Sequence, residues 1–259
     1  GAQTLSDAQI RAACEEARAL RLRSWVHAHA ASAIRAAALA GCTAVTHGTQ
    51  ATSVELALMA ERGTYFEPNI GLVIQNYVEN KARFLGIGNY TDEGFRFMEE
   101  VVPKNLALFR EAIRTPGLKV IMGTDAVAGG HAQNAREILY RVQEAGQSPD
   151  EALRAATSLA AEALGIADSV GTIAVGRVAD FVAVPGDPRL DIAALQRIAF
   201  VMQGGAPIVA PVRLGRTPAP RADWPSYGGD AGGLKYSPAA EIDRTNVHLL
   251  REAFRWDAN

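Results

Sequence analysis

The chain has 259 residues, of which 48% are hydrophobic and 21% are charged. This is the make-up of an ordinary globular protein of one or two domains, with enough material for a sizeable core. A formal net charge of −2 and a pI near 6.3 give no basic face for nucleic acid. No run of about 18 apolar residues is present to span a bilayer. Partners among nucleic acids and a membrane span are therefore not expected.

The N-terminus and the two cysteines give little information about function. The first residue is Gly1, with no methionine and no basic or apolar leader after it, so we interpret the chain as truncated and without a signal peptide. The compartment, periplasmic or cytoplasmic, stays open. Cys14 and Cys42 have neither a CxxC partner nor a metal-ligand spacing, and we expect both to be core thiols.

The first part of the chain alternates between short apolar or β-branched runs and helical patterns. Ser6 to Gln9 has the form of a capping box, and Thr52 with Glu55 has the same form. These signals predict a helix at 7–20, an alanine-rich helix that ends at Ala40 and a helix at 52–63, separated by strands at 24–27 and 43–46. Each of these two strands ends in a histidine.

The same rhythm continues with one interruption. A third strand is predicted at 64–68, followed by a stretch rich in Gly, Asn and Tyr at 71–89 that has the character of an insertion over a site. A long helix at 92–114 and a fourth strand at 119–122 come next, and helices follow at 132–145 and 149–164. The fourth strand runs directly into Gly123-Thr124-Asp125.

Strand-then-helix units in succession predict an α/β fold with parallel strands. Four such units are half of a (β/α)8 barrel of the TIM type, and the polar candidates stand at the C-terminal strand ends, where barrel enzymes place their chemistry. From Gly171 the pattern changes to short β runs with a Gly204-Gly205 hairpin turn. The predicted domains are a partial barrel at 1–168, a β-sandwich segment at 169–214, a linker at 215–222 and a separate, all-β-like tail at 223–259.

Three residues at these strand ends are the best candidates for a metal site. His27, His47 and Asp125 offer imidazole nitrogen and carboxylate oxygen, the ligands that Zn²⁺ accepts, and parallel strands would bring them to one ion. A lone histidine is more often a hydrogen-bonded interior residue, so the hypothesis depends on the matching positions of all three. Asp125 could also serve in catalysis, taking a proton from water and passing it to a leaving amine.

Three further residues are candidates for substrate binding. His29 is expected on the face opposite His27, or in the following loop, as a contact near the metal or as structural filler. His131 follows Gly129-Gly130 and could reach a substrate or cap the next helix. Tyr77, in the insertion, could line a pocket, although such loop aromatics are common without function.

Five motifs occur in an order that resembles the amidohydrolase superfamily. They are Val26-His27-Ala28-His29, Thr46-His47-Gly48-Thr49, Met122 to Ala126, Ala155-Ala156-Thr157 and Val170 to Asp180. The similarity covers residues 1–212 and looks closest to the branch of imidazolonepropionase-like enzymes and metal-dependent Xaa-Pro or Xaa-Arg dipeptidases. Imidazolonepropionase-like enzymes carry an acidic residue where this chain has Ala30, which favours the dipeptidase side.

The resemblance implies a divalent metal, with zinc as the expected ion and one or two ions in the complete protein. His27 and His47 would be metal ligands after the fifth and sixth strands, and Asp125 would bind metal and move protons after the eighth. The His-x-His and the carboxylated lysine of the family's first half have no counterpart here. The site is therefore expected to be incomplete, and the missing N-terminal half of the barrel is an expected partner.

The tail is similar to a different family. Asp223 to Asp230, with Lys235-Tyr236-Ser237-Pro238 and Ile242-Asp243, resembles the start of the propeller of pyrroloquinoline-quinone-dependent dehydrogenases. Only its first few dozen residues are present, so no quinone site is assigned.

The leading hypothesis is a hydrolase of C–N bonds in small amide or peptide substrates. A non-catalytic module of a fused quinoprotein is the alternative, and an α/β binding protein with structural histidines is a third. A half barrel exposes unpaired strand edges and an apolar face, so aggregation or homo-oligomer formation is also expected.

Overall fold

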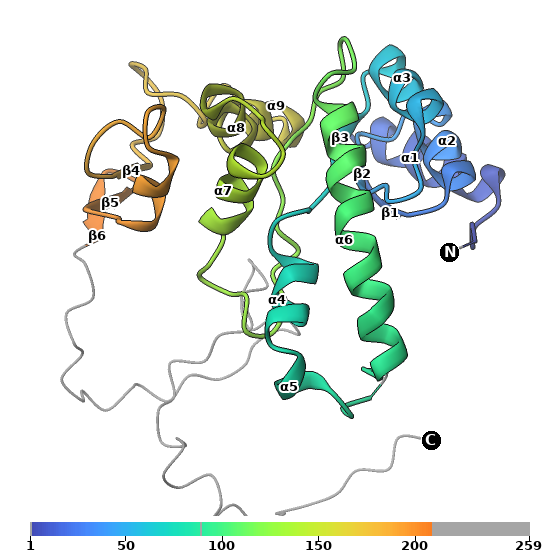
Figure 1. The fold of residues 1–259 in the computed structure, drawn as a ribbon. Coiled ribbons are helices and arrows are strands. Elements are labelled where there is room, and N and C mark those ends of the chain that lie inside the picture. Colours follow the sequence, from blue (N-terminus) through green and yellow to red (C-terminus); the bar gives the residue numbers. More distant parts are fainter. Residues whose placement is uncertain (1, 89, 209–259) are drawn as a thin grey trace, which may run out of the picture. The chain divides into compact units, whose positions relative to one another are not determined.

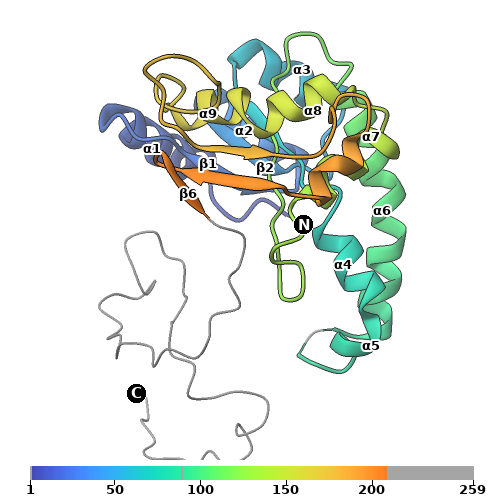
Figure 2. The same cartoon turned by 90° about the vertical axis from the view of Figure 1, so that its left-hand side faces the viewer.

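A computed structural model describes residues 2–88 and 90–208 of the chain (Figures 1 and 2). By their contacts, the described residues belong to one unit of the chain, Gly1–Ile208. The expected linker at 215–222 and the quinoprotein-like segment at 223–259 lie outside the described residues, as do positions 209–212 of the last expected β run. No helix among the described residues is long and apolar enough to cross a bilayer.

The centre of this unit is a parallel three-stranded sheet. Its strands are β1 (Trp25–Ala28), β2 (Ala44–His47) and β3 (Tyr65–Glu67), paired in that order. The expected fourth strand is reduced to an isolated parallel bridge between Phe66 and Val120, next to which Ile121 donates its N–H to the Phe66 carbonyl at 2.9 Å. The prediction of parallel α/β structure is confirmed.

Helices cover one face of this sheet. The covering helices are α1 (Asp7–Ala19), α2 (Ala31–Leu39), α3 (Ser53–Arg62) and α6 (Asp92–Ala112). Their apolar stripes form one core with Val45 and Phe66 of the sheet, and Ile34, Leu56 and Phe109 are fully buried there. The opposite face carries a smaller core of Ala44, Tyr65, Ile121 and Ala163, with Trp25 and Leu159 packed against it.

Local signals fixed the helix starts. Capping boxes are present at Ser6, Thr52 and Ser148, where each side chain pairs with the residue three positions on. Gly63 ends α3 in the left-handed conformation at φ 69°. The insertion at 71–89 contains two short helices, α4 (Val73–Glu79) and α5 (Lys81–Phe84).

The C-terminal helices differ from the prediction in one respect. The expected helix at 149–164 is two helices, α8 (Pro149–Ala156) and α9 (Ser158–Leu164), which follow α7 (Ala135–Gln143). Thr157 lies between them at φ −129° and ψ −93°, and its hydroxyl donates to the Leu153 carbonyl at 2.7 Å. A threonine that bonds to the preceding turn competes with the helical pattern, which accounts for the break.

The cysteine prediction was wrong. Cys14 of α1 and Cys42, just before β2, form a disulfide with a Cα–Cα distance of 5.1 Å. Both are buried in the core under the helices. Neither spacing nor composition indicated the pairing, because 27 residues that include a strand and a helix separate the two positions.

A second, antiparallel sheet follows, with strands β4 (Phe181–Ala183), β5 (Phe200–Gln203) and β6 (Ala206–Ile208). Gly204 and Gly205 turn the hairpin between β5 and β6 at φ 57° and 79°, as expected. A 3₁₀ helix, η1 (Ile192–Gln196), lies between β4 and β5 and packs through Ile192 against Ile138 and Leu139 of α7.

Candidate metal centre

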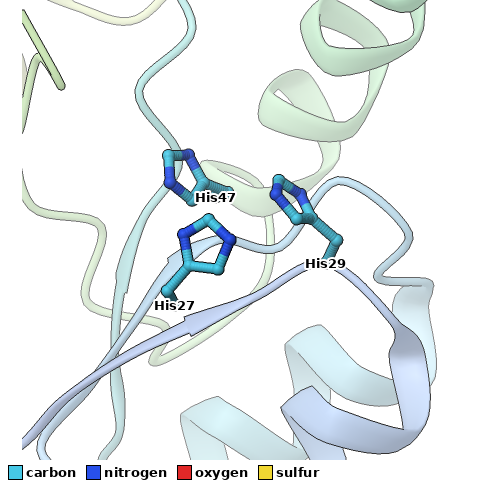
Figure 3. A group of neighbouring side chains, drawn as sticks. All are labelled: His27, His29 and His47. Carbon is cyan, nitrogen blue, oxygen red and sulfur yellow. The ribbon is translucent and has the colours of Figure 1, made fainter. Parts of the chain in front are cut away.

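Three histidines meet at the C-terminal ends of β1 and β2 (Figure 3). The ring centroids of His27 and His47 are 4.6 Å apart, and those of His27 and His29 are 4.8 Å apart. His29 and His47 stack at 5.0 Å. Ligand nitrogens of all three lie within 4.8 Å of one another, so the expected convergence of His27 and His47 is present, with His29 added.

The position of the His47 ring depends on an unusual backbone. Strand alternation puts His47 on the helix-covered side with Val45, whereas His27 lies on the other side with Trp25. His47 adopts φ 69° and Gly48 follows at φ 59°, which ends the strand and turns the ring toward His27. A Cβ on Gly48 would lie 2.5 Å from the Phe66 ring, so this turn requires glycine.

His29 occupies the second of its two expected positions, in the loop after the strand, because β1 ends at Ala28. The other expected position, on the face opposite His27, would not arise in a continuing strand, since residues two apart on a strand point to the same side. Thr49, in the loop after β2, lies 2.9 Å from His29 Nδ1 through its hydroxyl. The Gln50 N–H donates to the His29 carbonyl at 3.0 Å, so the loop that follows His47 also holds His29.

Burial and repulsion from neighbouring imidazoles favour the neutral form of His47 and His29. Burial, followed by the charges of His27 and His29, lowers the pKa of His47 to about 4, against a raising effect from Asp125. Burial and the His27 charge also lower the pKa of His29. A neutral imidazole is the form that binds a metal.

Asp125 lies near the cluster but is not part of the group of three. It has φ 45°, a left-handed conformation that is uncommon outside glycine but that aspartate adopts more readily than most residues, directly after the segment that bridges to β3. Its charge acts on His47 and on Tyr77. The two candidate ligands at strand ends, His47 and Asp125, thus share a left-handed backbone.

Of the other predicted residues, Tyr77 lies near this centre. It is half-buried in α4, and its ring centroid lies 5.0 Å from that of Phe84 and 5.0 Å from that of Tyr90. Burial, a hydrogen bond to Tyr90 and the nearby negative charges raise the pKa of Tyr77 to about 12. His131 lies exposed in the loop before α7, outside the histidine group.

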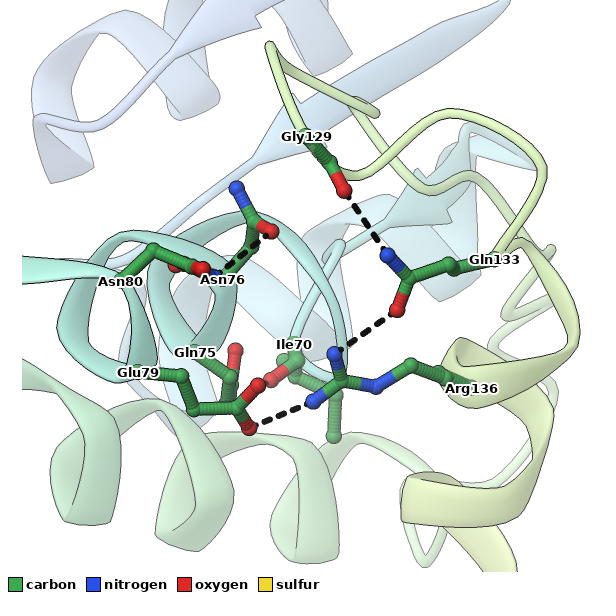
Figure 4. A network of polar contacts seen from close by, with 8 residues as sticks. All are labelled: Ile70, Gln75, Asn76, Glu79, Asn80, Gly129, Gln133 and Arg136. Carbon is green, nitrogen blue, oxygen red and sulfur yellow. Dashed lines mark hydrogen bonds and ion pairs between the residues drawn. The ribbon is translucent and has the colours of Figure 1, made fainter. Parts of the chain in front are cut away.

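Polar contacts attach the loop after Asp125 to α4 (Figure 4). Asn76 donates to the Ala128 carbonyl at 3.0 Å, and Gln133 donates to the Gly129 carbonyl at 2.7 Å. Arg136 then connects the loop to α4, because its guanidinium binds Gln133 at 3.0 Å and Glu79 at 2.5 Å. The insertion and the Asp125 loop are therefore held together on the side of the candidate centre.

A buried ion pair in α7 supports the loops around the candidate centre. Glu137 and Arg141 of α7 are both fully buried, with 2.7 Å between Oε1 and Nε. Glu137 accepts the N–H groups of Ile70 and Gly71 at 3.0 and 2.5 Å, and Arg141 donates to the Ile121 carbonyl at 3.0 Å. The pair thereby fixes the loop after β3 and the segment that leads to Asp125.

Sequence reasoning missed two polar residues at the end of β3. Glu67 pairs in register with Thr46 and lies on the same side of the sheet as His27 and Trp25. Trp25 Nε1 donates to Glu67 Oε2 at 2.6 Å, and burial, only partly opposed by this bond, raises the pKa of Glu67. Asn69, two residues on, is buried at φ 51°. The rule that selected His27 and His47, a polar residue at a strand end, also applies to Glu67.

The fold and the site define an α/β protein with a histidine cluster at the C-terminal edge of a parallel sheet, suited to holding a metal. The sequence matches the amidohydrolase family over residues 1–215, and the chain belongs to this family. Members of this family generally bind divalent metals, and the three histidines form a group within residues 2–88 and 90–208 that could do so.

Individual relatives agree with this assignment. Ochratoxinase from Aspergillus niger is 29% identical over 195 residues, which are 74% of this chain and 38% of that protein. The crystal structure of a Xaa-Pro dipeptidase with bound methionine in its active site is 31% identical, with a TM-score of 0.68 over 78% of this chain and 48% of the other. A prolidase complexed with N-methylphosphonate-L-proline is 28% identical, with a TM-score of 0.71 over 79% and 49%. The chain thus spans about half the length of these relatives or less.

Proposed function

We propose that the chain supplies part of the active site of a metal-dependent hydrolase that cleaves amide or peptide C–N bonds in small substrates such as dipeptides. The observation that carries the proposal is the meeting of His27, His29 and His47 at the ends of adjacent parallel strands. In this proposal the strands form one half of a (β/α)8 barrel, and the other half supplies the remaining ligands.

The residues fit a divalent metal of the zinc type. Two nitrogen ligands of one tetrahedral zinc ion lie roughly 3.3 Å apart, given Zn–N distances of about 2.0–2.1 Å. The nitrogens here lie within 4.8 Å of one another, which is compatible with a shared ion. The low pKa of His47 keeps it in the metal-binding form at neutral pH. His27 and His47 would hold the ion, with Asp125 beside them and His29 within reach.

Each remaining residue has a role that its position supports. A bound divalent ion lowers the pKa of a water ligand from about 15.7 to about 7 and polarises the substrate carbonyl. Asp125 would accept a proton from the attacking water and deliver it to the leaving amine. Tyr77 stays protonated, with a pKa near 12, and can donate a hydrogen bond to the substrate. His131, in the loop tethered to α4, would contact the substrate farther out.

Relatives support the substrate class. The Xaa-Pro dipeptidase acts on dipeptides by its name, another relative is a prolidase, and they are similar to this chain over 78% and 79% of its length.

The test is the metal content of the natural protein that carries this chain, measured by elemental analysis together with dipeptide hydrolysis. One to two equivalents of zinc are expected, and both metal and activity should fall in His47→Ala and Asp125→Asn. His131→Ala is the matched control for metal content, since this exposed histidine lies outside the cluster. A metal-free parent protein would refute the proposal and favour a non-catalytic module.

A further inference from the structure

We propose that Glu67 and Asn69 form a subsite that binds the protonated amino group of the substrate. The inference rests on the proposed function and adds the means by which a free N-terminus is recognised. It concerns two residues on the loop side of β3 that the metal centre does not use.

One oxygen of the Glu67 carboxylate accepts a hydrogen bond, and the other can accept one from a ligand. Its Oε2 accepts the hydrogen bond of Trp25 Nε1 at 2.6 Å, which is the hydrogen bond of this carboxylate within the described residues, and the nearby Asn69 amide also helps to lower its pKa against the larger effect of burial. Among the described residues, Glu67 forms no ion pair, and the nearby charge of Arg141 offsets the effect of burial on its pKa only in part. A carboxylate that is partly removed from water, with no cation in contact, favours one supplied by a ligand.

Asn69 is a buried amide without a partner. It is 3% exposed, and neither its Nδ2 nor its Oδ1 has a hydrogen-bond partner within residues 2–88 and 90–208. A buried polar group left unsatisfied costs about 1–3 kcal/mol, so such groups are kept where something else satisfies them. The left-handed backbone at φ 51° after Pro68 holds the side chain in this position.

The Glu67 and Asn69 side chains both pack against Gly123, two residues before Asp125. A Cβ at Gly123 would lie 2.0 Å from Glu67 Oε1 and 2.6 Å from Asn69 Oδ1, so both oxygens rest against its bare Cα. Two residues later the chain reaches Asp125, whose charge acts on Glu67. The subsite therefore lies beside the residue assigned to protonate the leaving group.

The donor set matches an ammonium group. Two acceptor oxygens, one of them charged, complement the three N–H donors of a protonated amine, while a substrate carboxylate would be repelled. The Asn69 Nδ2 remains free to donate to the adjacent carbonyl of a dipeptide. An N-acylated substrate has one N–H donor and no charge, and it would gain little here.

The test compares a dipeptide with its N-acetylated form in the zinc-loaded natural protein. Glu67→Gln keeps the shape and an acceptor for Trp25 but removes the charge. We expect kcat/KM for the free dipeptide to fall roughly 10- to 100-fold, mainly through KM, with a change below about twofold for the acetylated form. Asn69→Ala is expected to act in the same direction. Glu61→Gln, on the exposed side of α3, is the matched control and should leave both substrates unaffected.

Other outcomes overturn the proposal in separable ways. An equal loss for both substrates, accompanied by a lower melting temperature, would make Glu67 an anchor for Trp25 only. No change for either substrate would exclude the subsite while leaving the proposed hydrolase intact. A zinc-loaded parent protein that cleaves neither substrate would refute the proposed function, and this inference with it.

Discussion

His47 combines two features that rarely occur together in an ordinary interior histidine. Its backbone is left-handed, which costs of the order of 1–3 kcal/mol in a non-glycine residue. Its pKa is also lowered to about 4 by burial and by two neighbouring imidazoles. His47 is therefore held, at a cost in backbone strain, as a neutral imidazole. In this form its free ring nitrogen can bind a metal ion in place of a proton.

The low pKa predicts how the metal-free protein responds to acid. The unfolded chain takes up a proton on His47 near pH 6.5, whereas the folded chain does so only near pH 4. The unfolded state therefore binds more protons between these values, and this residue lowers the stability of the fold as the pH falls from about 6.5 to 4. NMR titration of the His47 ring should give a midpoint near 4, and His27→Gln should move it upward. A midpoint at 6.5 or above would contradict the described packing.

At the scale of single elements, α7 is held by one buried and one partly exposed ion pair. The Glu137–Arg141 pair is fully buried and receives two backbone N–H groups from the loop after β3. The Arg136–Glu79 pair lies on the same helix, with the two side chains 27% and 51% exposed. The two pairs provide an internal comparison between ion pairs in different environments.

We expect Arg141→Met to destabilise the protein by about 3–5 kcal/mol, because it leaves the Glu137 carboxylate buried and without a charge partner. Arg136→Met should cost at most about 1 kcal/mol, the range of exposed pairs. Urea denaturation of both variants, followed by circular dichroism, measures the difference. Equal effects would show that burial does not set the importance of the Arg141 pair.

Much of this element structure was predictable from the sequence, for local reasons. Helix starts followed from capping residues such as Ser6 and Thr52, and the ends of β1 and β2 followed from the runs that precede His27 and His47. The break at Thr157 was missed because a hydroxyl that bonds to the preceding turn leaves no trace in hydrophobic periodicity. The bridging segment around Val120 pairs too little to form a strand, although its composition is typical of one.

The site was predictable only in part, because its geometry depends on contacts distant in sequence. Spacing placed His27 and His47 at neighbouring strand ends, but the left-handed turn that unites their rings depends on Gly48 packing on Phe66. Glu67 gains its environment from Trp25, 42 positions earlier. Whether Asp125 and His131 act as expected remains a prediction.

At the scale of the whole molecule, the two faces of the parallel sheet are unequal. One face packs against four helices, while the other has the small core around Ala44 and Tyr65. Within the described residues, β1 pairs only with β2, so its outer edge is open. A (β/α)8 barrel would close this edge and cover this face with the remaining strands.

The chain produced by itself is therefore expected to self-associate. Sedimentation velocity should show dimers or larger species at micromolar concentration, and co-production with the other half of a barrel should yield a 1:1 complex instead. A monomer that melts cooperatively would show that the open edge and face are tolerated.

The Cys14–Cys42 disulfide makes the stability of the protein depend on the redox state of the compartment. It closes a loop with a sequence separation of 28, for which chain entropy gives a stabilisation of about 3.5 kcal/mol. Such bonds persist in oxidising compartments and are rare in reducing ones. Preparations from a reducing cytoplasm should therefore contain alkylatable thiols and melt several degrees below material secreted from the same cells. Mass spectrometry after alkylation distinguishes the two. The choice of expression host then becomes part of any measurement of activity, since reduction is expected to loosen the first helix, which packs against the sheet that carries the histidines.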